Sequence, residues 1–407
     1  MNEAIAEKKV MKIRAVVLCL IISIFPMFCF FQMNLFNVLG NYWVKASITT
    51  SDSIGYYSAA YIYGDAAMLL FAGLLLDRFS IAKLIFFAMI LKVTSIAMIL
   101  TFQTPAWIIA FRILGGFGHA FALLSAFRLA ILLFDEHHHG LMIGLVLTIA
   151  LLGGTLAQAP LDRFIYCFGW QTAILTDFFV GLALLIVIPL ILNSNKNYIP
   201  HTQHQGFNAV SYFRDFKIVA RCSGNYLCAI YICLLSLPLM LLGAVWGDSY
   251  LKAHFHINEI QSSIVISLLF IGLIIGFPCI GFLSDLFKNR RNSMIVGATA
   301  TLMMLGLILY ANISNVYCIS ALFLALGFLS SSQIIGYTVL GEINTAEITS
   351  TAMGFSNVLL MSFTATIQLI FNSILHTQHN LDFHAAMLFL IILVGISAVI
   401  PFFIKIK

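Results

Sequence analysis

Apolar residues occur along the chain in twelve runs of about 20 residues, separated by short polar segments. A helix needs roughly 20 apolar residues to cross a hydrocarbon core of about 30 Å. Each run therefore predicts a membrane-spanning helix. The predicted spans are residues 15–37, 54–76, 84–103, 106–134, 140–161, 170–192, 224–247, 260–283, 293–312, 316–341, 350–374 and 384–404. One longer polar segment separates the sixth span from the seventh.

Composition supports a membrane protein of the helical class. The 407 residues are 61% hydrophobic and only 9% charged, with a mean hydropathy of +1.01, whereas soluble domains carry roughly 25% charged residues. The runs are continuous and do not alternate, which excludes a β-barrel. The first run follows a basic tail without a cleavage site, so we expect an uncleaved signal anchor. The eight cysteines lie mostly in apolar runs and are interpreted as small hydrophobic residues.

The distribution of positive charge predicts the orientation. Of the 21 Lys and Arg residues, fifteen fall on the side of the N-terminus, three fall on the opposite side and three lie within spans. Cytoplasmic loops carry the excess of Lys and Arg. Both termini are therefore expected in the cytoplasm.

A short motif occurs in both halves. Gly73 is followed by Asp77 and Arg78, and Gly281 is followed by Asp285, with Arg290 and Arg291 shortly after. The two aspartates are 208 residues apart, and each ends the second helix of its half. We expect an N-terminal six-helix bundle over residues 1–192, a cytoplasmic linker over 193–223 and a C-terminal six-helix bundle over 224–407. Six plus six helices with matching signals are typical of a transporter with a site near the midplane.

These motifs resemble signatures of the major facilitator superfamily. The segment from Gly73 to Lys83 resembles the loop between helices 2 and 3, and Gly281 to Arg291 resembles its copy between helices 8 and 9. The stretch "RILGGFGHA", which begins at Arg112, matches the helix-4 pattern Arg-x-x-x-Gly-x-Gly-x-Ala. Longer phrases such as "GAVWGDSYL" resemble a bacterial branch whose substrate is undefined. The resemblance implies two pseudo-symmetric six-helix bundles that alternate access across the inner membrane.

The fifth span bears on the direction of transport. Exporters of the family carry Gly-x8-Gly-x3-Gly-Pro there. This chain has Gly144 and Gly153, but Ala157 and Gln158 stand where Gly-Pro is expected. The partial match leaves export open without supporting it.

The repeated aspartates predict a gating latch. Asp77 is expected to face the start of the helix near Thr349–Thr351, and Asp285 the start of the helix near Gly140. A carboxylate at a helix N-terminus is stabilised by about 0.3–1 kcal/mol, and by more when it is partly buried. The predicted latch residues are Gly73, Asp77, Arg78, Gly281, Asp285, Arg290 and Arg291. The alternative is two short turns with cytoplasmic positive charges.

Ionisable residues inside spans are costly and indicate functional sites. Asp65 and Lys92 lie at similar depth and could pair, either as a proton-sensitive site or as a static pair between scaffold helices. Arg112 and His119 share one face of a helix. In the family, the arginine of this motif is tied to proton coupling, and His119 could titrate beside it or be an interior histidine.

Two further charges lie within spans. Arg128 could bind an anionic substrate or extend to the interface. Asp177 is expected near the outer surface with a structural role.

Polar residues of the spans are the candidates for substrate binding, although each could equally be a packing hydrogen bond. They are Gln32, Asn34, Tyr61, Arg128, Gln158, Tyr231, Trp246, Gln333, Tyr337, Asn357 and Gln368. Cations on one wall of a cavity, with amides and aromatic residues on the other, suit a small organic solute that bears a carboxylate.

Other classes of function lack support in the sequence. Three consecutive histidines in "DEHHHG" cannot all face one ion from a helix, so no metal site is predicted. There is no phosphate-binding loop and no nucleophile–base constellation, so neither an enzyme nor a cofactor is expected. Nucleic acid is not an expected partner, and a monomer is expected.

We therefore predict proton-coupled uptake of a small polar solute, such as a carboxylate or an amino acid. A larger carboxylate compound such as a siderophore, moved in either direction, and a membrane sensor that does not transport remain the alternatives.

Overall fold

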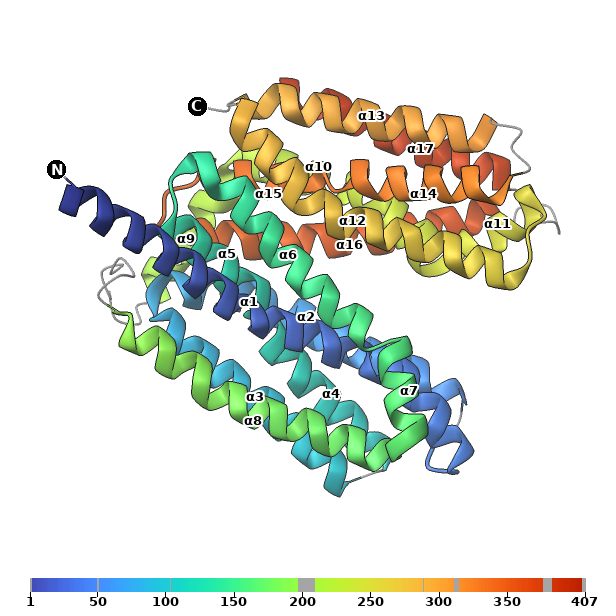
Figure 1. Ribbon diagram of the computed structural model, residues 1–407, viewed down its shortest axis with the longest axis horizontal. Helices are drawn as coiled ribbons and strands as arrows, with labels where there is room; N and C mark the ends of the chain where they lie inside the picture. The colour runs from blue at the N-terminus through green and yellow to red at the C-terminus, as the bar shows by residue number, and fades with distance from the viewer. Residues whose placement is uncertain are drawn as a thin grey trace. The chain divides into compact units, whose positions relative to one another are not determined.

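The structure is a computed structural model that describes residues 2–49, 51–102, 104–196, 209–287, 289–310, 315–375 and 383–404. Helices alone form its secondary structure in these ranges (Figure 1). The helices of the first half are α1 (Asn2–Lys45), α2 (Ser51–Arg78), α3 (Ile81–Thr101), α4 (Pro105–His119), α5 (Ala122–Leu133), η1 (Glu136–His138), α6 (His139–Leu156), α7 (Ala159–Phe168) and α8 (Trp170–Ser194). The others are α9 (Ala209–Arg221), α10 (Ser223–Leu237), η3 (Pro238–Trp246), α11 (Gly247–Phe255), α12 (Glu259–Phe287), α13 (Arg290–Tyr310), α14 (Val316–Ser330), α15 (Gln333–Ile343), α16 (Thr349–Leu375), α17 (Phe383–Val399) and η4 (Ile400–Phe402).

Twelve helical segments among the described residues are long and apolar enough to cross a membrane, which confirms the predicted number of spans. They are Ile13–Lys45, Tyr56–Arg78, Ile81–Thr101, Pro105–Leu133, Glu136–Phe168, Trp170–Ser194, Ser223–Gly243, Ile260–Phe287, Arg290–Tyr310, Val316–Ile343, Thr349–Leu375 and Phe383–Phe402. Residues 197–208 of the predicted linker, and the basic residues Lys288, Lys405 and Lys407, lie outside the described residues.

Several spans are interrupted, which the run of apolar residues did not predict. The fourth span divides into α4 and α5 at Ala120 and Phe121, and the tenth divides into α14 and α15 at Ser331 and Ser332. The fifth span divides at Gln158, directly before α7, whose first turn contains a proline. Proline lacks an N–H group and cannot continue the preceding hydrogen-bond ladder.

Tight glycine contacts recur in the two halves. A Cβ on Gly64 would lie 2.3 Å from the Ile113 carbonyl oxygen, so α2 and α4 touch through their backbones. Gly272, which is 208 residues after Gly64, has the same relation to Leu324 of α14, at 2.1 Å. Small residues let helix backbones approach closely. The 208-residue separation between Asp77 and Asp285 therefore also relates the glycine contacts of helix pairs α2/α4 and α12/α14.

The chain divides into two compact units, and each takes a short segment from the other half of the sequence. The first unit contains residues 1–134, 149–217 and 346–355; the second contains 135–148, 218–345 and 356–407. In the first unit, α4 packs against α2 and α3, and α3 runs beside α8 (Figure 1). In the second, α12 packs against α14 and α13 against α17. The division predicted from the sequence, at 193–223, remains a prediction.

Candidate functional site

Asp77, at the end of α2, lies at the N-terminus of α16. Its carboxylate accepts hydrogen bonds from the backbone N–H groups of Ser350, at 3.0 Å, and Thr351, at 2.7 Å. The Thr351 hydroxyl also donates to it, at 2.6 Å. Arg128 forms an ion pair with Asp77 and donates to the Ser350 hydroxyl at 2.8 Å. We call these four residues the Asp77 cluster.

The Asp77 cluster provides hydrogen-bond acceptors for backbone N–H groups at the start of α16. The first N–H groups of a helix have no partner within the helix, and a carboxylate there also benefits from the helix dipole. Gly73 permits the approach, because a Cβ there would lie 2.5 Å from the Ser350 carbonyl oxygen. The contact predicted between Asp77 and the start of this helix is present. The alternative of a simple charged turn does not account for it.

Asp285, at the end of α12, makes the corresponding contact with α6. It accepts hydrogen bonds from the backbone N–H groups of Gly140, at 3.1 Å, and Leu141, at 2.8 Å. Arg290 pairs with Asp285 at 2.7 Å. The backbones are close here too, since a Cβ on Gly281 would lie 2.2 Å from the Gly140 carbonyl oxygen. We call Asp285, Arg290, Gly140 and Leu141 the Asp285 cluster.

Other predicted latch residues bind neighbouring groups. Arg78 forms an ion pair with Asp215 of α9. Arg290 also pairs with Glu342 of α15, at 2.8 Å. Arg291 donates to the carbonyl oxygen of Ile404, at 3.1 Å.

Arg112 is buried and ties α4 to α1 and α2. Its guanidinium donates to the carbonyl oxygens of Tyr57 at 3.0 Å, Gln32 at 2.9 Å and Met33 at 3.1 Å. Its guanidinium carbon lies 4.4 Å from the centroids of the Phe36 and Tyr61 rings, so aromatic faces cover the charge. Among the described residues it forms no ion pair with a carboxylate.

The hydroxyl of Tyr61 connects the other titratable groups of this region. Lys92 donates to it, and the ammonium group lies 4.7 Å from the Tyr61 ring centroid. The same hydroxyl lies 2.9 Å from Nδ1 of His119 and donates to the Cys29 carbonyl oxygen at 3.1 Å. A phenol has one proton to donate and can accept others. A change in one partner therefore changes the hydrogen bonding available to the rest.

Asp65 is buried and does not pair with Lys92, so the predicted pair is wrong. The reason is the packing order: α4 lies against both α2 and α3, and these two helices barely touch. The Asp65 Oδ1 atom is buried and finds no hydrogen-bond partner within the described residues. Asp65 is thus a carboxylate inside a span without a neutralising contact to that oxygen.

Asp177 of α8 is also buried. Its Oδ2 atom accepts a hydrogen bond from the Gln32 side chain at 2.8 Å, whereas Oδ1 has no partner in the described part of the chain. Asp65 and Asp177 therefore each have one buried carboxylate oxygen without a hydrogen-bond partner in the described ranges.

The sequence matches the family profile of the Major Facilitator Superfamily over residues 20–242 and 228–406. The chain belongs to this superfamily. No curated protein sequence matches it. Its substrate is therefore not indicated by a near relative.

Solved structures share the superfamily fold. A variant of the E. coli fucose:proton symporter FucP is 15% identical, with a TM-score of 0.75, covering 96% of this chain and 99% of that one. A bacterial homologue of the iron transporter ferroportin, in an outward-facing state, is 12% identical, with a TM-score of 0.73 and coverage of 95% and 100%. The proton:xylose symporter XylE, bound to 6-bromo-6-deoxy-D-glucose, is 13% identical, with a TM-score of 0.70 and coverage of 97% and 96%. At these identities the likeness shows the fold alone.

The remaining candidates of this superfamily member are distributed over both units. In the second unit, the Tyr337 hydroxyl donates to Asn357 at 3.0 Å, and the buried Tyr231 donates to the Met294 carbonyl oxygen at 3.1 Å. Gln333 is buried, while Trp246 and Gln368 are half-buried. In the first unit, Asn34 donates to the Phe30 carbonyl oxygen at 2.9 Å, and Gln158 is exposed at the break before α7. Tyr337 and Asn357 are thus two second-unit candidates that bind one another directly.

The sequence predicts Arg128 as a substrate-binding candidate, but the structure places its charge in the Asp77 cluster. Its side chain is 2% exposed, so the alternative of extension to the interface is wrong. The partners Asp215 and Glu342 were missed. The available signal was their charge, since Asp215 lies among the basic residues of α9 and Glu342 lies in the last turn of α15.

Proposed function

We propose that the chain is a proton-coupled secondary transporter that takes up a small polar organic solute by alternating access. The observation that carries the proposal is Asp65, a buried carboxylate of α2 whose Oδ1 atom has no partner within the described residues. Ionisable groups within membrane spans are rare and mark ion pathways and proton relays. Protonation would neutralise the Asp65 carboxylate and so remove the cost of a buried charge without a partner at Oδ1. We place both termini in the cytoplasm and the protein in a bacterial inner membrane.

The family supports transport, and two structural neighbours support protons as the coupling ion. Both FucP and XylE are described as proton symporters of sugars. The polar network around Tyr61, which includes Lys92 and His119, lies in the same unit as Asp65. It supplies buried groups that can redistribute a proton or a charge.

We further propose that the two aspartate clusters gate the cytoplasmic side. Each joins a helix end from one half of the sequence to a helix start from the other: α2 to α16 at Asp77, and α12 to α6 at Asp285. Breaking either contact exposes a carboxylate and helix N–H groups that water can satisfy. The clusters would therefore form when the cytoplasmic side closes and release when it opens.

The solute is proposed as a small carboxylate or amino acid, the class that the positive charges of the spans suggest. The structure also favours a second candidate, a neutral polyhydroxylated solute. The cations that suggested an anion all have other partners: Lys92 binds Tyr61, Arg112 binds backbone carbonyls and Arg128 binds Asp77. Amides and hydroxyls, such as the Tyr337–Asn357 pair, suit hydroxyl groups.

Uptake into proteoliposomes tests the proposal. Purified protein would be given an inward proton gradient and a panel of carboxylates, amino acids, sugars and ferric siderophores. Accumulation of one small solute, abolished by a protonophore, is the expected result. Accumulation of a siderophore alone would establish the larger-substrate alternative. Saturable binding without flux for any ligand of the panel would establish the sensor alternative and contradict transport.

A further inference from the structure

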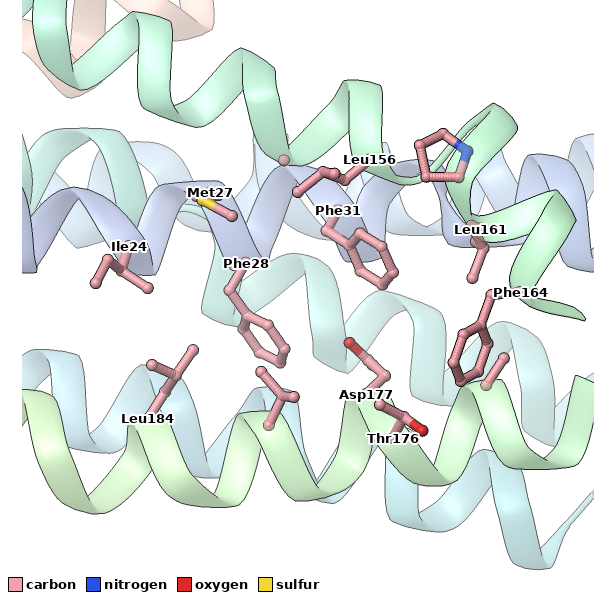
Figure 2. A pocket seen from close by; sticks show the side chains of 14 residues that line it. Ile24, Met27, Phe28, Phe31, Leu156, Leu161, Phe164, Thr176, Asp177 and Leu184 are labelled. Carbon is pink, nitrogen blue, oxygen red and sulfur yellow. The ribbon is translucent and has the colours of Figure 1, made fainter. Parts of the chain in front are cut away.

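A pocket of about 330 Å³ lies between α1, the end of α6, α7 and α8, entirely within the first unit (Figure 2). Its walls are apolar side chains, among them Phe28 and Phe31 of α1 and Leu161 and Phe164 of α7. Small-molecule sites have volumes from about 300 Å³ upward and combine apolar walls with a few polar groups. The pocket is therefore large enough for a small ligand.

One charged side chain lies in this apolar wall. Figure 2 shows the carboxyl group of Asp177 rising from α8 toward Phe31 of α1. The residue is 3% exposed, and its Oδ1 atom has no hydrogen-bond partner among the described residues. The other polar side chain of the lining, Thr176, already donates to the Thr172 carbonyl oxygen at 2.7 Å. Asp177 is thus the polar group of the pocket lining that has an unsatisfied hydrogen-bond acceptor.

The chemistry of Asp177 selects the head group of a ligand. A carboxylate accepts hydrogen bonds, and burial of an unpaired one is costly. Gln32 supplies a single donor, and no lysine or arginine of the described chain forms an ion pair with Asp177. A protonated amine would supply both the missing donor and the opposite charge. A carboxylate or phosphate head would instead place like charges together.

The surroundings select the body of the ligand and its route. Side chains at the rim, such as Leu156 and Val180, are exposed and apolar. Asp177 lies seven residues after the start of α8, which is about 10 Å along the helix axis at 1.5 Å per residue. The head group of a lipid would have to leave the membrane interface to reach Asp177 at this depth. A free amphiphile that is already dissolved in the hydrocarbon core could reach Asp177 directly.

We propose that this pocket binds a lipophilic amine, a protonated amine on a hydrocarbon body, which enters from the bilayer and donates to Asp177 Oδ1. None of the residues that line the pocket is a proposed proton or gating residue, although Gln32 links Asp177 to Arg112. Occupancy of the pocket does not require that the chain transport anything. A ligand in this pocket would contact α1, α7 and α8 together, and its binding would therefore favour the arrangement of these three helices that forms the pocket.

Photoreactive decylamine, decanol and decanoate, each with a diazirine at the same chain position, test the proposal. The protein would be held in phosphatidylcholine nanodiscs, and crosslinks would be mapped by mass spectrometry to residues 24–31, 153–164 and 173–184. We expect the amine to label these peptides at least ~10-fold more than the alcohol, because a charge-assisted hydrogen bond is added. Equal labelling by amine and alcohol, or preferential labelling by decanoate, would overturn the proposal.

Variants test whether the preference for the amine depends on the carboxylate of Asp177. Asp177→Asn should reduce amine labelling to the level of the alcohol, whereas Asp162→Asn should not, because Asp162 of α7 is an exposed carboxylate outside the pocket lining. If Asp177→Asn does not fold, Val180→Trp serves instead: it keeps the aspartate, fills the mouth of the pocket and should reduce amine labelling. Unchanged amine labelling in the folded variants contradicts the site. Loss of labelling when phosphatidylethanolamine replaces phosphatidylcholine would assign the pocket to a lipid head group and also overturn it.

Discussion

The carboxylate of Asp77 accepts a hydrogen bond of 2.7 Å from the backbone N–H of Thr351, 274 residues further along the chain. The contact joins the end of the second span to the start of the eleventh. Asp285 makes the matching contact with Leu141 at the start of the fifth span, at 2.8 Å. One short motif, used twice, thus binds a helix N-terminus from the other half of the sequence in each unit.

Asp77→Asn should destabilise the protein, because Arg128 is left as a buried charge without its partner. Breaking a buried ion pair costs about 3–5 kcal/mol. In the double variant Asp77→Asn/Arg128→Gln, that part of the loss should be recovered, with a coupling of about 0.5–3 kcal/mol. Thermal unfolding of the two single variants and the double variant in one detergent measures the coupling. Strictly additive losses would contradict a pair between these side chains.

Gly281→Ala should disrupt the Asp285 cluster, since its Cβ would lie 2.2 Å from the Gly140 carbonyl oxygen. Backbone atoms cannot move aside as a flexible side chain can. Gly306→Ala of α13 is the matched control, because a Cβ there meets nothing within 4 Å. Alanine is favoured over glycine in a helix by about 1 kcal/mol. We expect a lower unfolding temperature for the first variant and an unchanged or higher one for the second; equal shifts would refute the close contact.

Tyr61→Phe should destabilise the first unit through Lys92 and His119. The change removes the hydroxyl to which Lys92 donates and which lies 2.9 Å from His119 Nδ1. A buried donor that loses its partner costs about 1–3 kcal/mol, and more when it is charged. Tyr57→Phe is the control, because its hydroxyl is hydrogen-bonded to the part-buried, uncharged Thr49 hydroxyl, at 2.8 Å. Similar unfolding temperatures for the two variants would count against the network.

Native cysteines can test the proposed orientation. Cys167, at the end of α7, is exposed, and Cys222 precedes α10 after the linker. With both termini in the cytoplasm, Cys167 faces the outside and Cys222 the cytoplasm. In variants that retain one of these cysteines, a membrane-impermeant maleimide should label Cys167 in intact spheroplasts. It should label Cys222 only after permeabilisation. The reverse pattern would invert the topology.

The sequence predicted features that depend on local pattern. Runs of apolar residues located the twelve spans, and the repeated Gly-x-x-x-Asp spacing predicted the contacts of Asp77 and Asp285 with distant helix starts. These succeeded because span length and helix polarity follow from the chain itself.

Partners chosen by helix packing could not be predicted in the same way. Equal depth suggested a pair between Asp65 and Lys92, but α4 packs against both of their helices, and Lys92 binds Tyr61 instead. Arg128 could not be assigned to Asp77 without knowledge of which helix faces meet. The break at Gln158 was also hidden, since the apolar run continues across it.

The central claim, that proton-driven accumulation depends on Asp65, is tested most directly by the variant Asp65→Asn. Asparagine keeps the size of the side chain but cannot take up a proton. Proteoliposomes containing wild-type protein, Asp65→Asn or the exposed-site control Asp162→Asn would be assayed with the solute identified by the uptake panel. Accumulation under an inward proton gradient and gradient-free counterflow exchange would both be measured. We expect Asp65→Asn to lose accumulation but retain exchange, and the control to retain both. Undiminished accumulation by Asp65→Asn would contradict a role for Asp65 in proton coupling.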